Sequence, residues 1–212
     1  MLLPPGWAYS VSAPPYQSIR PVGETCLTDL RGLTDFEHIL IGLLADTPRS
    51  GYELKRYFAS TPAVVYEPSS GALYPALRRL ENRGLLRSEL AVSSGRRQQR
   101  RHFVTEAGRE AHRHWLRQPV DPATVGRDIG THLMRFVMAE SELTPAETLT
   151  FLDDLGRALD GFVAGIEIFL RDFPLAGRHP ALALEHGLAV HQASRQWVQD
   201  ASARLALAAS KA

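Results

Sequence analysis

The stretch from Ser50 to Arg101 constrains the fold of this chain more than any other. It reads GYELKRYF, then SSGALYPALRRLENRGLL, then SGRRQQRRHFV. These segments predict a short helix, a second helix with a basic outer face, and an arginine-rich hairpin. That order is typical of a winged helix-turn-helix, in which one helix enters the DNA major groove and a β-wing lies along the backbone.

Charge is unevenly placed along the chain. The 212 residues carry a formal net charge of only +1, yet eight arginines stand against two glutamates between Ala72 and Arg101. A locally basic segment on a neutral chain indicates a polyanion that is held by one face of the molecule. Apolar residues make up 44% of the chain and charged residues 22%, as in an ordinary soluble globular protein of one or two domains.

The N-terminal part is predicted to be a leader without regular structure. Residues 1–33 contain five prolines and little periodicity, so we expect them to be irregular or disordered, or to form an arm that packs on a partner subunit. The start, MLLPPGWAYS, lacks the basic region and the uninterrupted apolar segment of a secretory signal.

Cysteine content and hydropathy indicate a cytoplasmic protein without a membrane partner. The single cysteine, Cys26, excludes an internal disulfide and a metal site built from cysteines. The apolar run at 39–45 is far shorter than the roughly 20 residues that are needed to cross a bilayer.

Residues 34–118 are predicted to form the winged helix-turn-helix domain. Thr34 and Ser50 each precede a glutamate by three residues, and these capping boxes predict the first two helix starts. A polar loop from Ser93 to Arg101 separates two short strands, because its side chains are too polar to bury. The expected elements are helices at 34–47, 50–59 and 69–82, strands at 85–92 and 102–105, and a helix at 105–117.

Residues 119–212 are predicted to form an α-helical dimerisation domain. Val125, Ile129, Leu133, Phe136 and Val137 mark one helix. The sequence TPAE at 144–147 starts a long helix, and another long helix starts near residue 180. Neither can bury its apolar stripe alone, so we expect the two to pack on each other and on a second copy of the chain. The fold class is therefore mainly α, with a two-stranded β-wing.

The outer face of the third helix supplies the expected DNA-reading residues. Its N-terminal side chains are small or polar enough for the major groove, and a helix N-terminus favours a phosphate. Arginines farther along reach base edges, and arginines of the wing follow the duplex backbone. The predicted DNA-binding residues are Tyr52, Lys55, Ser69, Ser70, Gly71, Ala72, Tyr74, Arg78, Arg79, Arg96, Arg97, Arg100 and Arg101.

Tyr74 and the arginines among these residues also have a structural interpretation. Tyr74 then belongs to the rim of the core, and the wing arginines form a solvated loop. Arg78 and Arg79 then form a solvated face that is paired with Glu81 or Glu53.

The same motifs resemble the PadR family of transcriptional regulators. The matching residues are Gly51, Tyr52, Leu54, Gly71, Leu73, Tyr74, Pro75, Leu77, Leu80, Glu81, and Thr105 to Arg109. The resemblance covers about residues 36–117. It implies a homodimeric winged-helix repressor that binds double-stranded operator DNA and is released by a small-molecule effector near the dimer interface.

An effector pocket is expected on the C-terminal helices or at their junction with the fourth helix. The resemblance implies that the ligand is a small aromatic or apolar molecule, and the candidate residues are aromatic or methionine. They are Trp115, Met134, Phe136, Met138, Phe162 and Trp197. Ordinary core packing is the alternative for each of them.

No catalytic residue, cofactor or metal site is predicted. The chain has no glycine-rich phosphate loop and no nucleophile elbow, and His112 and His114 are two residues apart, so they face different sides of a helix. The competing hypothesis is a winged helix that contacts proteins or senses a ligand without sequence-specific DNA binding. Strongly salt-dependent DNA affinity separates the two. Effector identity, operator sequence, and repression versus activation stay open.

Overall fold

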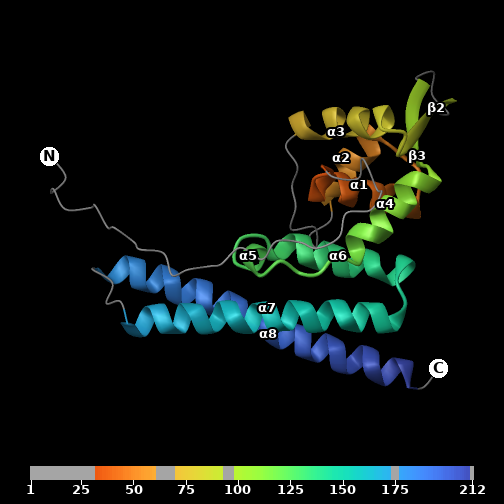
Figure 1. The fold of residues 1–212 in the computed structure, drawn as a ribbon. Coiled ribbons are helices and arrows are strands. Elements are labelled where there is room, and N and C mark those ends of the chain that lie inside the picture. Colours follow the sequence, from red (N-terminus) through yellow and green to blue (C-terminus); the bar gives the residue numbers. More distant parts are fainter. Residues whose placement is uncertain (1–31, 61–69, 93–97, 173–176, 211–212) are drawn as a thin grey trace, which may run out of the picture. The chain divides into compact units, whose positions relative to one another are not determined.

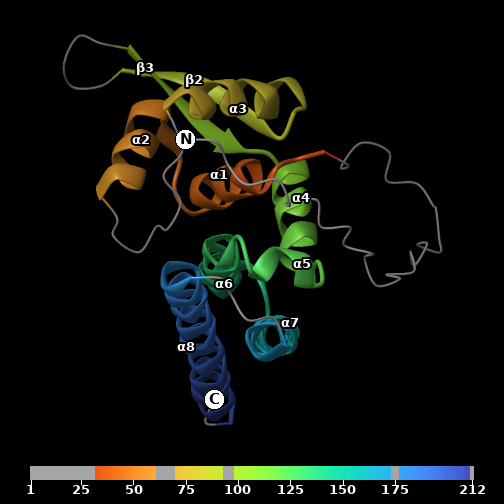
Figure 2. The ribbon, with the colours of Figure 1, turned by 90° about the vertical axis from the view of Figure 1, so that its left-hand side faces the viewer.

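The computed structural model describes residues 32–60, 70–92, 98–172 and 177–210. Within these ranges the fold is mainly helical with one small sheet (Figures 1 and 2), which confirms the predicted fold class. Most of the predicted leader therefore lies outside the described residues. The elements are α1 (Asp35–Asp46), β1 (Arg49–Ser50), α2 (Gly51–Ser60), α3 (Ser70–Asn82), β2 (Leu86–Val92), β3 (Gln98–Val104), α4 (Glu106–Leu116), α5 (Pro122–Val125), α6 (Ile129–Glu142), α7 (Pro145–Asp172) and α8 (Arg178–Ala209).

The predicted capping boxes are confirmed. The Thr34 backbone N–H donates to the Glu37 carboxylate at 2.9 Å, and the Ser50 N–H donates to Glu53 at 2.7 Å. In return, each hydroxyl accepts from the backbone N–H of its glutamate. Because each box satisfies two backbone groups at a helix end, the starts of α1 and α2 are specified locally.

The sheet has three antiparallel strands in the order β1-β3-β2. The short strand β1, which pairs Ser50 with Arg101, was not predicted. The prediction that the second long strand starts at His102 was wrong, because β3 starts at Gln98. Arg100 and Arg101 consequently lie in a strand and not in a loop. Their backbone groups bond to β2 while their side chains stay partly in solvent, so polarity did not prevent pairing.

Helix α3 divides into the two faces that its periodicity predicts. Leu73, Ala76, Leu77 and Leu80 are all buried. Tyr74, on the other face, is 51% exposed. The helix stops before Gly84, whose φ of 68° is a conformation that glycine adopts without strain.

The prediction of one helix from Val125 to Val137 was wrong. Val125 ends the short α5, and α6 starts afresh at Ile129 because Asp128 caps it by accepting from the Thr131 N–H at 3.1 Å. The helical phase therefore resets. Val137 is 60% exposed, while Met134 on another face is buried.

Helix α6 lies between the winged helix and the two long helices, with α1 and α4 packed on one side and α7 on the other (Figures 1 and 2). Arg135 of α6, which is 5% exposed, donates to the carbonyl oxygens of Trp115, Leu116 and Gln118 at the end of α4. A cation at a helix C-terminus is favourable, so Arg135 fixes α4 against α6.

The two long helices pack on each other as predicted. They bury Leu155, Leu159 and Val198 between them. None of the helices in the described ranges is long and apolar enough to cross a membrane.

Candidate nucleic-acid interface

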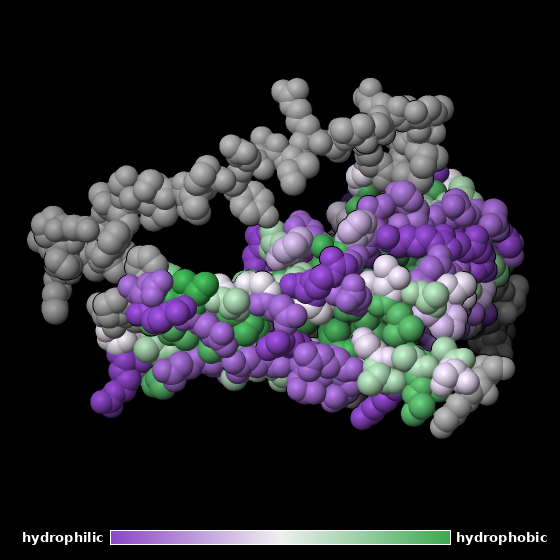
Figure 3. Space-filling view, turned by 60° about the horizontal axis from the view of Figure 1, so that its bottom comes forward, coloured by the Kyte–Doolittle hydropathy of each residue, from purple (hydrophilic) through white to green (hydrophobic). Residues whose placement is uncertain are grey.

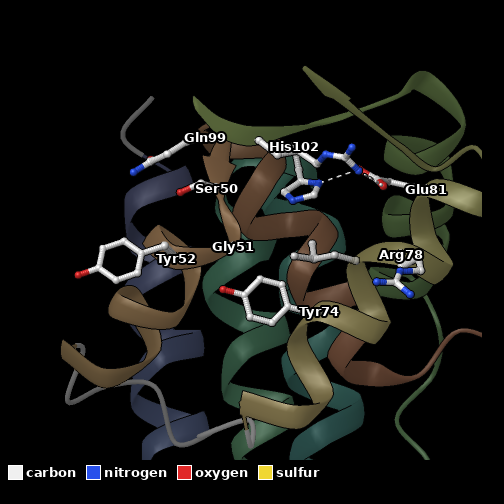
Figure 4. Close-up of a pocket in the computed structure, with 10 residues that line it drawn as sticks. Ser50, Gly51, Tyr52, Tyr74, Arg78, Glu81, Gln99 and His102 are labelled. Carbon is white, nitrogen blue, oxygen red and sulfur yellow. Dashed lines mark hydrogen bonds and ion pairs between the residues drawn. The ribbon is translucent and has the colours of Figure 1, made fainter. Parts of the chain in front are cut away.

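A groove of about 610 Å³ opens between α2, α3 and β3 (Figure 4). Helix α3 supplies one wall and the paired strands β1 and β3 supply another. The lining residues are Ser50, Gly51, Tyr52, Tyr74, Leu77, Arg78, Glu81, Gln99, Arg100 and His102. Four of them, Tyr52, Tyr74, Arg78 and Arg100, are predicted DNA-binding residues, so the fold brings these four together.

Tyr74 lies across the gap between α3 and α2. Its ring lies directly against Gly51, the first residue of α2, and Figure 4 shows the two side by side. Because half of the tyrosine remains exposed, the ring is neither a core residue nor a freely solvated one.

A small polar network forms one end of the groove. The Glu81 carboxylate lies 3.0 Å from Nδ1 of His102 and 3.8 Å from a guanidinium nitrogen of Arg100. Burial lowers the pKa of His102 below its usual value, and the neighbouring carboxylate only partly offsets this. Glu81 therefore holds the base of the wing against α3.

A second carboxylate holds the neighbouring wing residue. Since β1 pairs Ser50 with Arg101, the arginine comes within 3.3 Å of Glu53, the capping-box residue of α2. The hydrogen bond from the Ser50 backbone N–H, together with the charge of Arg101, lowers the pKa of Glu53. The wing is thus tied to both α2 and α3.

The two adjacent arginines of α3 differ in their partners. Arg79 pairs with the buried Glu37 at 2.8 Å, which is neither of the two carboxylates considered from the sequence. Burial raises the pKa of Glu37, but the Thr34 hydrogen bond and Arg79 outweigh this and lower it. Arg78 is exposed, and no carboxylate in the described ranges pairs with it. Of the two described arginines that line the groove, Arg100 pairs with Glu81 and Arg78 has no carboxylate partner.

The other predicted DNA-binding residues are placed less uniformly. Lys55 is exposed on α2. Gly71, Ala72 and Arg79 line a different hollow of about 460 Å³ beside the start of α1. Ser69, Arg96 and Arg97 lie outside the described residues. Ser70 is the first residue of α3, but its side chain is also outside the described part.

Several lining residues were not predicted. Glu81 and His102 are 21 residues apart, and only the pairing of β3 beside α3 brings them together. Gln99 was assigned to the loop. Gly51 is part of the GYEL motif, but that motif gave no indication that the Tyr74 ring would pack on it.

Residues 40–114 match the model of the transcriptional regulator PadR-like family, and they contain α2, α3, the sheet and most of α4. This segment belongs to the PadR-like family. We call residues 40–114 the PadR-like domain. They lie within residues 36–117, the stretch whose motifs carried the resemblance.

The chain is also similar to individual proteins. It is 27% identical over 90 residues to the probable transcriptional regulator Rv1176c of Mycobacterium tuberculosis, a match that covers 42% of this chain and 48% of the relative. The match thus spans about half the length of that relative.

Similar solved structures include Bacillus subtilis PadR in complex with operator DNA, at 17% identity and a TM-score of 0.40, covering 80% of this chain and 98% of that one. They also include the same B. subtilis protein in complex with p-coumaric acid, at 18% identity and a TM-score of 0.37, covering 81% and 99%.

The six predicted effector residues belong to α4, α6, α7 and α8 and pack in two groups. Trp115, Met134 and Met138 are buried, and Trp115 stacks on His38 of α1 at a centroid distance of 5.0 Å. The others pack around the long helices: Phe136 meets Trp197 edge to face at 5.1 Å, and Phe162 lies 4.6 Å from His191. Within the described ranges no three acidic, histidine or cysteine residues are grouped to hold a metal ion.

Proposed function

We propose that this chain is a PadR-like DNA-binding transcriptional regulator. The observation that carries the proposal is the groove, where Tyr74 and the unpaired Arg78 of α3 face the arginine-bearing strand β3. The family to which residues 40–114 belong is one of transcriptional regulators, so we assign the chain no catalytic activity. As a DNA-binding regulator it would act in the cytoplasm.

The exposed face of α3 would enter the major groove. Arg78 can bind O6 and N7 of a guanine through two parallel hydrogen bonds, which discriminates a base, whereas Arg100 and Arg101 at the base of the wing suit phosphates. Their carboxylate partners, Glu81 and Glu53, keep them oriented in the free protein. We assign Arg79 a structural role and no base contact, because its charge neutralises the buried Glu37.

The neighbouring arginines provide a matched test. Binding to the DNA upstream of the protein's own gene is measured at several salt concentrations. We expect Arg78→Ala to weaken sequence-specific binding by about 5- to 150-fold and to relax preference at one base position. Arg79→Ala is expected to keep that preference while it lowers the melting temperature, because Glu37 is left buried without its cation.

The outcomes decide between the interpretations. Equal loss of preference in both variants would contradict the assignment of Arg78 as the base-reading arginine. If wild type and both variants bind any duplex equally weakly, direct recognition is wrong, and a protein partner of the winged helix becomes the better hypothesis.

We propose further that residues 119–212 form a homodimerisation domain, with the domain boundary near residue 118. Helices α7 and α8 leave large apolar side chains exposed: Ile168 is 49%, Leu182 53% and Val190 40% exposed. Figure 3 shows apolar patches among polar side chains on the face of these helices. A second copy on this surface would bury the patches and set two α3 helices about 34 Å apart, one turn of DNA.

A charge in this surface tests the dimer. Ile168→Asp is expected to convert a dimer to a monomer in sedimentation velocity, because an isolated charge is costly to bury. The matched change Asp153→Asn on the exposed, charged part of α7 should leave the mass unchanged. A monomeric wild type, or a variant that dimerises as tightly as wild type, would contradict this surface.

We propose finally that the protein is a repressor and that a small aromatic or apolar effector releases it from DNA. What supports an effector is the layer where α1, α4 and α6 meet. There one buried ring nitrogen each of His38 and His132 has no hydrogen-bond partner among the described residues. Repeating the DNA titration with small aromatic acids tests release.

A further inference from the structure

The first residue of α2 is a glycine that its backbone does not require. The described glycines with positive φ are Gly32, Gly84 and Gly177, so Gly51 has a conformation that any residue adopts. Its helix start is already capped by Ser50 and Glu53. Since alanine has the higher helix propensity, a glycine at this position needs another reason.

That reason is the ring of Tyr74. A Cβ atom on Gly51 would lie 2.7 Å from Cε1 of Tyr74 and 3.4 Å from Cδ1 and Cζ, so the three nearest atoms all belong to one ring. A separation of 2.7 Å is well below carbon–carbon contact distance. Any side chain at position 51 therefore displaces the tyrosine or pushes α2 away from α3. Gly51 itself is buried, so the ring forms part of its cover.

We propose that Gly51 is a positioning residue for DNA recognition, acting through Tyr74. This rests on the proposed function. The bare backbone of Gly51 forms a flat seat on which the ring lies before DNA arrives, so the ring loses less conformational freedom on binding. Leu77 of the same helix also lines the groove and is buried.

The chemistry of the seated ring specifies what it contacts. An aromatic face that is held at the mouth of a groove suits an apolar part of a base edge, and in the major groove this is the thymine methyl. Arg78, one helical turn along α3, lies on the same face and suits guanine. We therefore infer that each half-site contains a thymine contacted by Tyr74 within a few base pairs of the guanine read by Arg78.

The seat is tested first without DNA, by thermal unfolding of Gly51→Ala, Tyr74→Ala and the double variant. Because the ring can swing about its χ1 bond, we expect Gly51→Ala to lower the melting temperature by only a few degrees in wild type. In the Tyr74→Ala background the same change should leave it unchanged or raise it. Gly161→Ala in α7, where a Cβ meets nothing within 4 Å, controls for helix propensity. Equal effects of Gly51→Ala in both backgrounds would overturn the contact.

Recognition is tested with duplexes that differ only at the thymine, replaced by uracil to remove its methyl group. We expect wild type to lose about 5-fold or more in affinity with uracil. Gly51→Ala should bind both duplexes alike, with an unchanged salt slope, and Tyr74→Phe should retain the discrimination. A purely structural role for Gly51 would weaken both duplexes together.

The results separate the inference from the function on which it rests. If wild type prefers its operator and Gly51→Ala discriminates thymine from uracil as well as wild type does, the positioning role is wrong and the proposed function stands. If wild type has no sequence preference, the proposed function fails, and with it the recognition role of Gly51, whatever the thermal cycle shows about the seat.

Discussion

Replacing Gly108 by alanine is expected to destabilise the PadR-like domain by about 3 kcal/mol. A Cβ on Gly108 would collide with the carbonyl oxygen of Leu85 and would lie 2.9 Å from Cγ1 of Val104. The collision is with backbone, which cannot rotate away as a side chain can. That carbonyl is itself held in place, because it accepts a hydrogen bond from the backbone N–H of Thr105 at 3.1 Å. Relief would require α4 to move off the sheet.

Thermal or urea unfolding measures the effect. At the size of this chain, 3 kcal/mol corresponds to a fall in melting temperature of roughly 6–12 °C. Gly161→Ala is again the control, since an alanine in open space on a helix should stabilise slightly. A Gly108→Ala variant as stable as wild type would show that α4 does not press on Leu85 as described.

The parts of the fold that the sequence predicts are those specified by neighbouring residues. Thr34, Ser50 and Thr144 each form a complete capping box with a glutamate three residues later. Their signal lies within four residues of sequence, so no tertiary information is needed. The core face of α3 follows in the same way from helical periodicity.

The errors in the sheet concern pairings between distant segments. Strand β3 contains Gln99, Arg100 and Arg101, a composition that favours a loop, yet its backbone pairs with β2 on one side and with β1 on the other. Strand propensity depends on such neighbours and is weak in isolation. The break before α6 was missed because Asp128 was not recognised as a cap inside a continuous apolar pattern.

The candidate site shows the same division. Helical spacing alone placed Tyr74 and Arg78 on one exposed face. It did not separate Arg78 from Arg79, because Glu37, which pairs with Arg79, lies 42 residues earlier in the chain. Helical spacing also did not indicate that the Tyr74 ring would pack on Gly51, because the two residues lie in different helices.

Acidification from pH 7 to pH 5 is expected to destabilise the protein by a few kcal/mol. Burial lowers the pKa of His38 to about 3, with a smaller effect of the neighbouring His112, and burial lowers the pKa of His112 to about 4. Glu37 opposes the first shift, and Glu142 opposes the second. Both folded-state pKa values lie below the ordinary value of 6.5. At a pH between each folded-state pKa and 6.5, the unfolded chain therefore binds more protons than the folded chain. Stability is therefore complete above about pH 6.5 and falls as the pH drops toward 4, by about 2 kcal/mol per histidine at pH 5.

Urea unfolding at pH 7 and pH 5 measures this loss above the range in which most carboxylates titrate. His38→Phe keeps a ring against Trp115 but cannot bind a proton, so the difference in unfolding free energy between the two pH values should shrink by about half. His186→Ala, at an exposed position on α8, should leave the difference unchanged.

Because His38 and His112 lie where α1 and α4 meet α6, their protonation should also loosen the PadR-like domain from the long helices. Faster hydrogen exchange in α4 and α6 at pH 5, with α7 unchanged, is the expected pattern. Equal stability of wild type at both pH values would contradict the burial of neutral histidines in this layer.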